Sequence, residues 1–170
     1  MNETQCTCYR VCLRIMNASH KHKKIEETIG VKATREHKKG DPQTWKGKAI
    51  QNKQGRAKLW GNDIWILDSL LPNTCKLDKH LTWLFDKILP YKKFLTKLRY
   101  EGVGMDIYCS YRTGSPTGGL GIHPRFYKTL AELNIPIEIS VQFDEPLNEI
   151  FKQVSDHSQK KSIKMKKKSK

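Results

Sequence analysis

The chain has 170 residues, 37% of them hydrophobic, and a formal net charge of +15 at pH 7. This length predicts a single core, and no window reaches the roughly 18 uncharged apolar residues that a membrane helix needs. The charge predicts attraction to an anionic surface: nucleic acid, an acidic protein or an anionic membrane.

The cysteines favour a reducing compartment. Their number, five, is odd, whereas a secreted disulfide framework uses pairs. Arg10 and Arg14 interrupt the apolar stretch near the N-terminus, so a secretory signal is not expected. We therefore expect a soluble, cytoplasmic protein that does not act at a membrane.

The first part of the chain predicts a strand, a helix and a long loop. Residues 9–15, YRVCLRI, alternate between two faces, which is the period of a half-buried strand. Residues 23–30 carry isoleucines four apart and end in glycine, as a short helix does. Residues 31–58 are polar and lack a sustained period, which predicts a long loop. Residues 59–69 then have strand composition, with Gly61 as a bulge.

The middle of the chain predicts a long helix and two strands. Residues 77–98 carry one apolar stripe at helical spacing. Pro90 cannot continue the hydrogen-bonding pattern, so a kink or restart is expected there. Residues 104–111 alternate like a strand, and a short strand is expected at 120–122 after a glycine-rich connection.

The last part predicts a third helix and the most regular strand. Pro124 suits the first position of a helix. Residues 135–143, IPIEISVQF, place five apolar side chains on one face of a strand. Residues 147–154 have the pattern of a short amphipathic helix.

The element order is β-α-β-α-β-β-α-β. It predicts an α+β fold in which one mixed or antiparallel sheet is packed on one face by helices. We expect an N-terminal segment over residues 1–8, one domain over 9–157, and a disordered lysine-rich tail over 158–170.

Five segments in order support a family resemblance: YRVCLRI, IEETIGVKATREHKKGD, LW, LDKHLTWLFDKILPYKKFLTKL and GGLGIHPRFYKTLAELNIPIEISVQF. Together they resemble the bacterial domain-of-unknown-function family forty-two seventy-nine, over about residues 9–143. The resemblance implies an α+β fold and carries over no catalytic residue. His123 stands where such sequences place a serine that can cap a helix, and histidine is the poorer cap. By analogy, small obscure bacterial proteins of this kind are immunity or defence-associated binders.

The glycine-rich loop 114–121 has part of a phosphate-binding pattern. Two of its glycines have the right spacing, but Leu120 and Gly121 occupy the positions of the lysine and the hydroxyl residue. A flexible connection is therefore the main expectation. A weak anion site remains open, because free amides at the following helix start would lie near Arg112 and Arg125.

Residues 35–41, REHKKGD, form a second candidate. Arg35, Lys38, Lys39 and Asp41 lie together, and the cations could bind phosphate oxygens of a partner. The alternative is a solvated turn, because the sequence Gly-Asp-Pro reverses a chain.

Aromatic and lysine side chains are candidates for contacts with nucleic acid. Trp60 and Tyr108 could stack on bases, Tyr108 from the polar face of its strand. The tail could add affinity that falls with salt, or serve only as a solubilising terminus. Its candidate residues are Lys160, Lys161, Lys166, Lys167 and Lys168.

Metal and catalytic patterns are weak. Cys6, Cys8, His20 and His22 give C-x-C and H-x-H, which is too tight for structural zinc. No Ser/His/Asp spacing and no nucleophile elbow is present, so we expect neither a cofactor nor enzymatic activity.

The leading hypothesis is a small binding domain without enzymatic activity. It would engage a macromolecular partner through residues 35–60 and a sheet face, as an immunity or defence protein does. The second hypothesis is a nucleic-acid-binding protein that uses the basic loop and the lysine tail. The third is an enzyme for an anionic substrate, because catalytic groups meet in space rather than in sequence.

Overall fold

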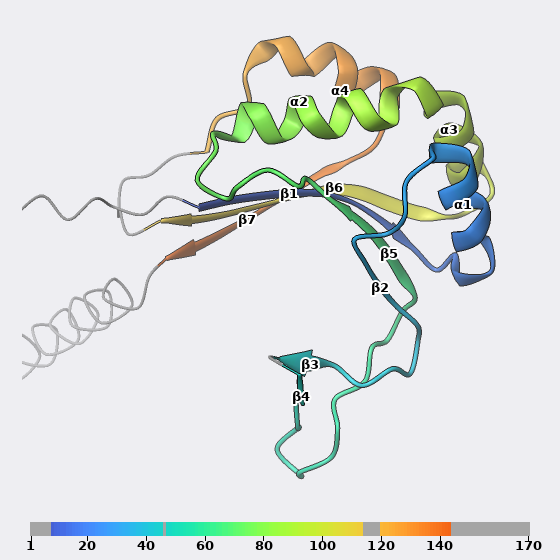
Figure 1. Ribbon diagram of the computed structural model, residues 1–170, viewed down its shortest axis with the longest axis vertical. Coiled ribbons are helices and arrows are strands. Elements are labelled where there is room, and N and C mark those ends of the chain that lie inside the picture. The colour runs from blue at the N-terminus through green and yellow to red at the C-terminus, as the bar shows by residue number, and fades with distance from the viewer. Residues whose placement is uncertain (1–7, 46, 114–119, 144–170) are drawn as a thin grey trace, which may run out of the picture.

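A computed structural model describes residues 8–45, 47–113 and 120–143. These residues form a mixed sheet of five strands, in the order β2-β5-β1-β6-β7. The strands are β1 (Cys8–Met16), β2 (Arg35–His37), β5 (Ile64–Asp68), β6 (Gly104–Thr113) and β7 (Ile137–Phe143). Central β1 is antiparallel to β5 and β6, β2 is antiparallel to β5, and β6 runs parallel to β7. Helices lie on one face of this sheet, so the predicted α+β fold is confirmed (Figure 1).

The alternating residues of β1 separate the two faces of the sheet. Val11, Leu13 and Ile15 are fully buried in the core under the helices. Arg10 and Arg14 project from the opposite face, because successive side chains of a strand point to opposite sides. This opposite face carries the first of the two candidate functional surfaces.

Four α-helices of the described residues complete the fold, and their ends follow from local chemistry. They are α1 (His22–Ile29), α2 (Leu77–Ile88), α3 (Lys92–Tyr100) and α4 (Tyr127–Leu133). Gly30 closes α1 in the left-handed conformation, with φ of 72°. Pro90 lies in a short 3-10 turn, Leu89–Tyr91, which separates α2 from α3 as the sequence predicts. Asn134 ends α4, also with a left-handed φ of 50°.

The core lies between the helices and the sheet. Leu81, Leu84 and Ile88 of α2 are fully buried over the sheet, as is Leu95 of α3. Trp65 of β5 is also fully buried. Burying side chains of this size stabilises the fold by about 2 to 3 kcal/mol each. The helix layer therefore buries one face of the sheet and leaves the other face uncovered by helices.

The predicted loop at 31–58 is partly wrong, because it contains β2 and two short strands, β3 (Thr44–Trp45) and β4 (Lys48–Ala49). These strands are held by backbone pairing and show no alternation of apolar side chains, so hydrophobic periodicity could not reveal them. Residues 38–63, between β2 and β5, project from the body on the side away from the helices, and are called the arm below (Figure 1).

Two other expectations are corrected. Residues 120–122 form no strand, and the segment beginning at 59 becomes a strand only at Ile64, so Gly61 is not a bulge within it. The apolar face of β7 is only partly covered: Ile139 and Val141 remain 43% and 44% exposed.

Two groups of expectations are not addressed by the described residues. The helix at 147–154 and the tail from 158 lie outside them, as do residues 114–119 of the glycine-rich loop. Within the described ranges, no helix has the length and apolar character needed to cross a bilayer.

Candidate functional site

The sheet face opposite the helices, here called the open face, is the first candidate surface. The strand registers place its side chains in rows across β2, β5, β1, β6 and β7. It comprises Arg10, Cys12, Arg14, Arg35, Ile66, Asp68, Asp106, Tyr108, Ser110, Arg112, Glu138, Ser140 and Gln142. Four of these residues are arginines and three are acids, which leaves a net charge of +1, and none is a lysine.

Arg14 occupies the centre of the open face. Its Nε and one terminal nitrogen each donate to a carboxylate oxygen of Asp106 at 2.7 Å. The same terminal nitrogen donates to Glu138 at 2.6 Å, and the guanidinium lies 4.3 Å from the ring centre of Tyr108. Hydrogen bonding to Asp106 raises the pKa of Arg14 above its ordinary value. The charge of Arg14 is therefore permanent and already balanced within the sheet.

Asp68 organises the edge of the open face nearest β2. Its carboxylate accepts from Nε of Arg10 at 2.8 Å, from Nε of Arg35 at 3.0 Å and from the hydroxyl of Thr34 at 2.8 Å. Burial raises the pKa of Asp68, but these hydrogen bonds outweigh it and lower the pKa to about 2. Arg35, a predicted anion contact, is thus part of an internal ion-pair cluster.

The aromatic candidates are also engaged within the chain. Arg14 covers one side of the Tyr108 ring. Trp60 stacks on His37, with ring centroids 4.3 Å apart and planes 11° apart. One face of the Tyr108 ring and one face of the Trp60 ring are therefore covered by neighbouring side chains. The stacked pair of Trp60 and His37 lies at the base of the arm.

A cavity of about 370 Å³ lies at one end of the open face. Ser69 and His80 line it, with the serine oxygen 2.8 Å from Nδ1 of the imidazole. Burial lowers the pKa of His80, which keeps the ring neutral near pH 7. The nearby acid, Asp68, is held by Arg10 and Arg35 instead of the imidazole. The arrangement joins the end of β5 to α2, and it is not a Ser-His-acid triad.

The arm is the second candidate surface. Its backbone pairs with itself: Trp60 N donates to Asp41 O at 2.9 Å, and Lys58 N donates to Ile50 O at 2.7 Å. At the tip, the side-chain oxygen of Asn52 accepts from the Arg56 amide at 3.0 Å. None of the arm's described side chains is buried. The arm is therefore a projection held by backbone hydrogen bonds among its own segments, and no described side chain of it is buried in a core.

The sequence REHKKGD, residues 35–41, forms a hydrogen-bonded turn at the base of the arm. Asp41 accepts from the Lys38 amide at 2.8 Å, while Asp63 accepts from the Lys39 amide at 2.7 Å. Gly40 has a φ of 90°, a conformation that favours glycine. Asp41 is thus a turn residue, and the side chains of Lys38 and Lys39 are exposed.

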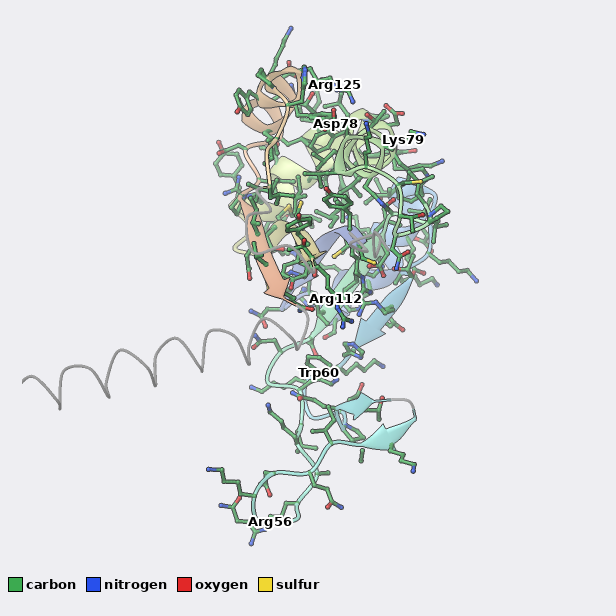
Figure 2. The ribbon with its side chains drawn as sticks, turned by 90° about the vertical axis from the view of Figure 1, so that its left-hand side faces the viewer. Arg56, Trp60, Asp78, Lys79, Arg112 and Arg125 are labelled. Atoms are coloured by element: carbon green, nitrogen blue, oxygen red, sulfur yellow. The ribbon has the colours of Figure 1, made fainter. Side chains whose placement is uncertain are left out.

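Positive charge on the arm is not compensated. Residues 38–63 contain seven basic side chains and two acids, and both acids bind backbone amides at the base. Among the described residues, no carboxylate forms an ion pair with any of the arm's cations. Figure 2 shows Arg56 at the far tip and Trp60 near the base. The arm thus presents exposed cations from its base, at Lys38 and Lys39, to its tip, at Arg56.

The predicted anion site at Arg112 and Arg125 is not formed as a unit. Figure 2 shows the two labelled residues well apart, with Arg125 beside Asp78 at the helical end and Arg112 near the sheet. Arg125 pairs with Asp78 at 3.2 Å and lies over Phe126. His123 caps the following turn after all, because its Nδ1 accepts from the Arg125 amide at 3.2 Å.

The open face carries a set of ion pairs, called the lattice below, in which Asp68, Asp106 and Glu138 hold Arg10, Arg14 and Arg35. The sequence does not predict these pairs, although it contains signs of the residues that form them. Arg10 and Arg14 fall on the polar face of one predicted strand, and Asp106 falls on the polar face of another. Only the adjacency of β1 and β6 brings them together. Over the described ranges, no group of three histidine, cysteine, aspartate or glutamate side chains could hold a metal ion, and Cys6 lies outside these ranges.

Comparison with known proteins identifies the family of the chain. No curated protein and no solved structure matches the chain. The sequence model of the family described as a domain of unknown function, DUF4279, matches residues 4–144, a range that includes the open face and the whole arm. The chain belongs to the DUF4279 family.

Proposed function

We propose that the chain is a binding domain without enzymatic activity whose arm grips the phosphate backbone of nucleic acid. The observation that carries the proposal is the uncompensated charge of the arm, seven basic side chains against two acids that are both engaged at its base. Cations that pair with no carboxylate of the described residues can neutralise phosphates without first breaking such an ion pair.

The shape of the arm favours a duplex over a single strand. A narrow projection that contains short paired strands can enter the major groove of a double helix, and we expect its lysine and arginine side chains to reach the phosphates beside the groove. Single-strand binding instead needs a row of aromatic rings on which bases stack. Trp60 at the base is already stacked on His37. The lysine tail would add affinity that is independent of sequence.

The proposed setting is the bacterial cytoplasm. Cys12 and Cys109 are buried free thiols, and Cys75 is a half-buried one. Reduced cysteines are usual in the cytoplasm and uncommon in secreted proteins. This supports a reducing compartment in which nucleic acid is accessible.

The test compares two charge-reversal variants of the full chain. The arm variant carries Lys48→Glu, Lys53→Glu and Arg56→Glu, all at exposed positions. We expect its affinity for a DNA or RNA duplex of about 20 base pairs to fall at least about 30-fold at low salt. Fluorescence anisotropy gives the dissociation constants.

The matched control reverses three exposed lysines on the helical side, Lys76, Lys93 and Lys128. Its net charge equals that of the arm variant, so a general charge effect lowers both affinities equally. Equal affinity of the two variants would contradict the proposal, because binding would then depend on total charge and not on the arm.

A second function, protein recognition, is favoured by the composition of the open face. This face carries arginine and tyrosine and no lysine, and protein interfaces are enriched in the first two and depleted in the third. Its charges are nearly balanced, so it does not attract phosphates as the arm does. An immunity or defence-associated role would use this surface.

Protein recognition is tested by capture of partners with nuclease-treated full chain. Tyr108→Ala removes the aromatic centre of the open face, while Tyr100→Ala removes a tyrosine that is 88% exposed on α3. A partner of the open face is retained by the Tyr100 variant and lost by the Tyr108 variant. A protein lost equally from both, or from neither, does not bind the open face.

A further inference from the structure

The outer edge of β7 lies outside the two surfaces described above. β7 pairs with β6 on one side, and no described strand pairs with its other side. Ile139 and Val141 remain 43% and 44% exposed beside this edge. An edge strand with exposed aliphatic side chains is a template for another strand.

β7 lacks the basic residues, proline and glycine that often protect edge strands. In a chain with 32 lysine and arginine residues among 170, the segment Ile137–Phe143 contains neither of them, nor any proline or glycine. The opposite edge strand, β2, is short, is charged through Arg35 and Glu36, and leads directly into the arm. Only the β7 edge is therefore left open to pairing within the described sheet.

The backbone register shows which groups of β7 are available. The Ile107 amide donates to the carbonyl of Pro136, so the even-numbered residues of β7 bond to β6. The odd-numbered residues, including Ile139 and Val141, direct their amides and carbonyls to the free edge. These are the same residues whose apolar side chains are exposed.

We propose that this edge pairs antiparallel with the same edge of a second copy of the chain. With the two-fold axis at Ser140, Ile139 of each copy lies opposite Val141 of the other, as a hydrogen-bonded pair. The entire strand then pairs, and Glu138 lies opposite Gln142, so no like charges meet directly. The dimer joins the two sheets into one, and the exposed aliphatic side chains cover each other.

The sequence of β7 favours a second copy of the same strand as the partner of its free edge. The strand is complementary to itself in this register, and its single charged residue faces an amide. In the dimer the two arms lie at opposite outer edges of the joined sheet, because each arm leaves from the β2 side. Dimerisation is independent of nucleic-acid binding and is measured without it.

The first measurement is the molar mass of the nuclease-treated full chain at tens of micromolar, by sedimentation or light scattering. We expect a dimer. Val141→Pro should yield a monomer, since it removes only an amide that points to the free edge and leaves the β6 ladder intact. Tyr127→Lys, at a side chain 57% exposed on α4, should remain dimeric.

Two single cysteine variants test the register of the paired β7 strands. They do not require β7 to tolerate a proline. Ser140→Cys places two thiols across the two-fold axis in a non-hydrogen-bonded pair, where Cα atoms lie about 4.5 Å apart and a disulfide can form. Gln142→Cys faces Glu138 of the other copy, so it should not cross-link. Wild-type chain in parallel measures cross-linking through the native cysteines.

A dimer that Val141→Pro dissociates, with cross-linking at position 140 and not at 142, supports the proposal. Monomeric wild type at these concentrations, without cross-linking of Ser140→Cys above the wild-type level, overturns it. A dimer that cross-links equally at both positions overturns the register and the proposed edge pairing. Loss of duplex binding, by contrast, has no bearing on this result.

Discussion

The open face and the arm both display basic side chains, but only the open face balances them. Arg14 is held by Asp106 and Glu138, and Asp68 holds two further arginines. The arm has no comparable carboxylates along its length. Basic side chains therefore have different roles in the two regions. In the sheet they stabilise the fold, and on the arm they remain available to a partner.

This contrast gives a rule for mutations. Substitutions in the lattice of the open face should lower stability and leave duplex affinity nearly unchanged. Substitutions of arm cations should do the opposite. A lattice variant that weakens binding as strongly as an arm variant would remove the distinction.

The largest expected effect on stability is that of Asp106→Ala. It leaves the half-buried guanidinium of Arg14 with Glu138 as its remaining acid, and Asp106 is 10% exposed. Breaking such a pair costs roughly 3 kcal/mol. Urea unfolding should show this loss, whereas the duplex dissociation constant of the folded variant should stay within about twofold of wild type. A loss under 1 kcal/mol would show that the pair is effectively solvated.

Asp68 gives the next largest effect, together with a dependence on pH. Its pKa is about 2 in the folded chain and 3.8 as the ordinary value, so it stabilises the fold above about pH 4. This contribution, roughly 2 kcal/mol, is lost as the pH falls from about 4 toward 2. Asp68→Asn should remove that part of the acid destabilisation in unfolding curves measured at several pH values. An unchanged pH profile in the variant would contradict the assignment.

A smaller effect is expected for single arm cations. Lys58→Ala should weaken duplex binding about threefold to fivefold and reduce the salt slope by about 1, because it removes one phosphate contact. Its unfolding free energy should stay within about 0.5 kcal/mol of wild type, since Lys58 is exposed. Lys128→Ala on α4 is the control, and equal weakening by both would argue against a role specific to the arm.

The smallest effect concerns the reactivity of the Cys12 thiol, which lies on the open face opposite Asp68 and Tyr108 in the strand register and is only 1% exposed. Burial raises the pKa of Cys12 to about 11 and that of Cys109, under the helices, to about 12. Thiol reagents at pH 8 should therefore label neither in the folded chain. Asp68→Asn should speed labelling of Cys12 and not of Cys109, as measured by mass spectrometry. Equal labelling of both would indicate global unfolding and not a local opening of the lattice.

The parts of the fold that depend on side-chain periodicity were predictable. Alternation in residues 9–15 and 104–111 predicted the strands β1 and β6 but not their adjacency, and Pro90 marked the break between α2 and α3. The arm was not predictable, because β3 and β4 are held by backbone bonds that leave no apolar pattern.

The candidate surfaces were predictable only in part. Lys38 and Lys39 were recognised as exposed cations, and they lie at the base of the arm. The capture of Arg35 by Asp68 depends on the pairing of β2 with β5, which no local pattern encodes. The pairing of strands that are distant in the sequence thus determines which cations remain available to bind a partner.

The central claim is that the arm binds nucleic acid through its cations. Pro42 and Leu59 are bridged antiparallel across the arm, so residues 43–58 can be replaced by an Asn-Gly turn without disturbing the body. The dissociation constant for a duplex is then measured between about 50 and 200 mM salt for both chains. The account predicts a salt slope that is shallower by about 2 or more in the shortened chain, with unchanged unfolding. Equal slopes and equal affinities in a shortened chain that remains folded would contradict it.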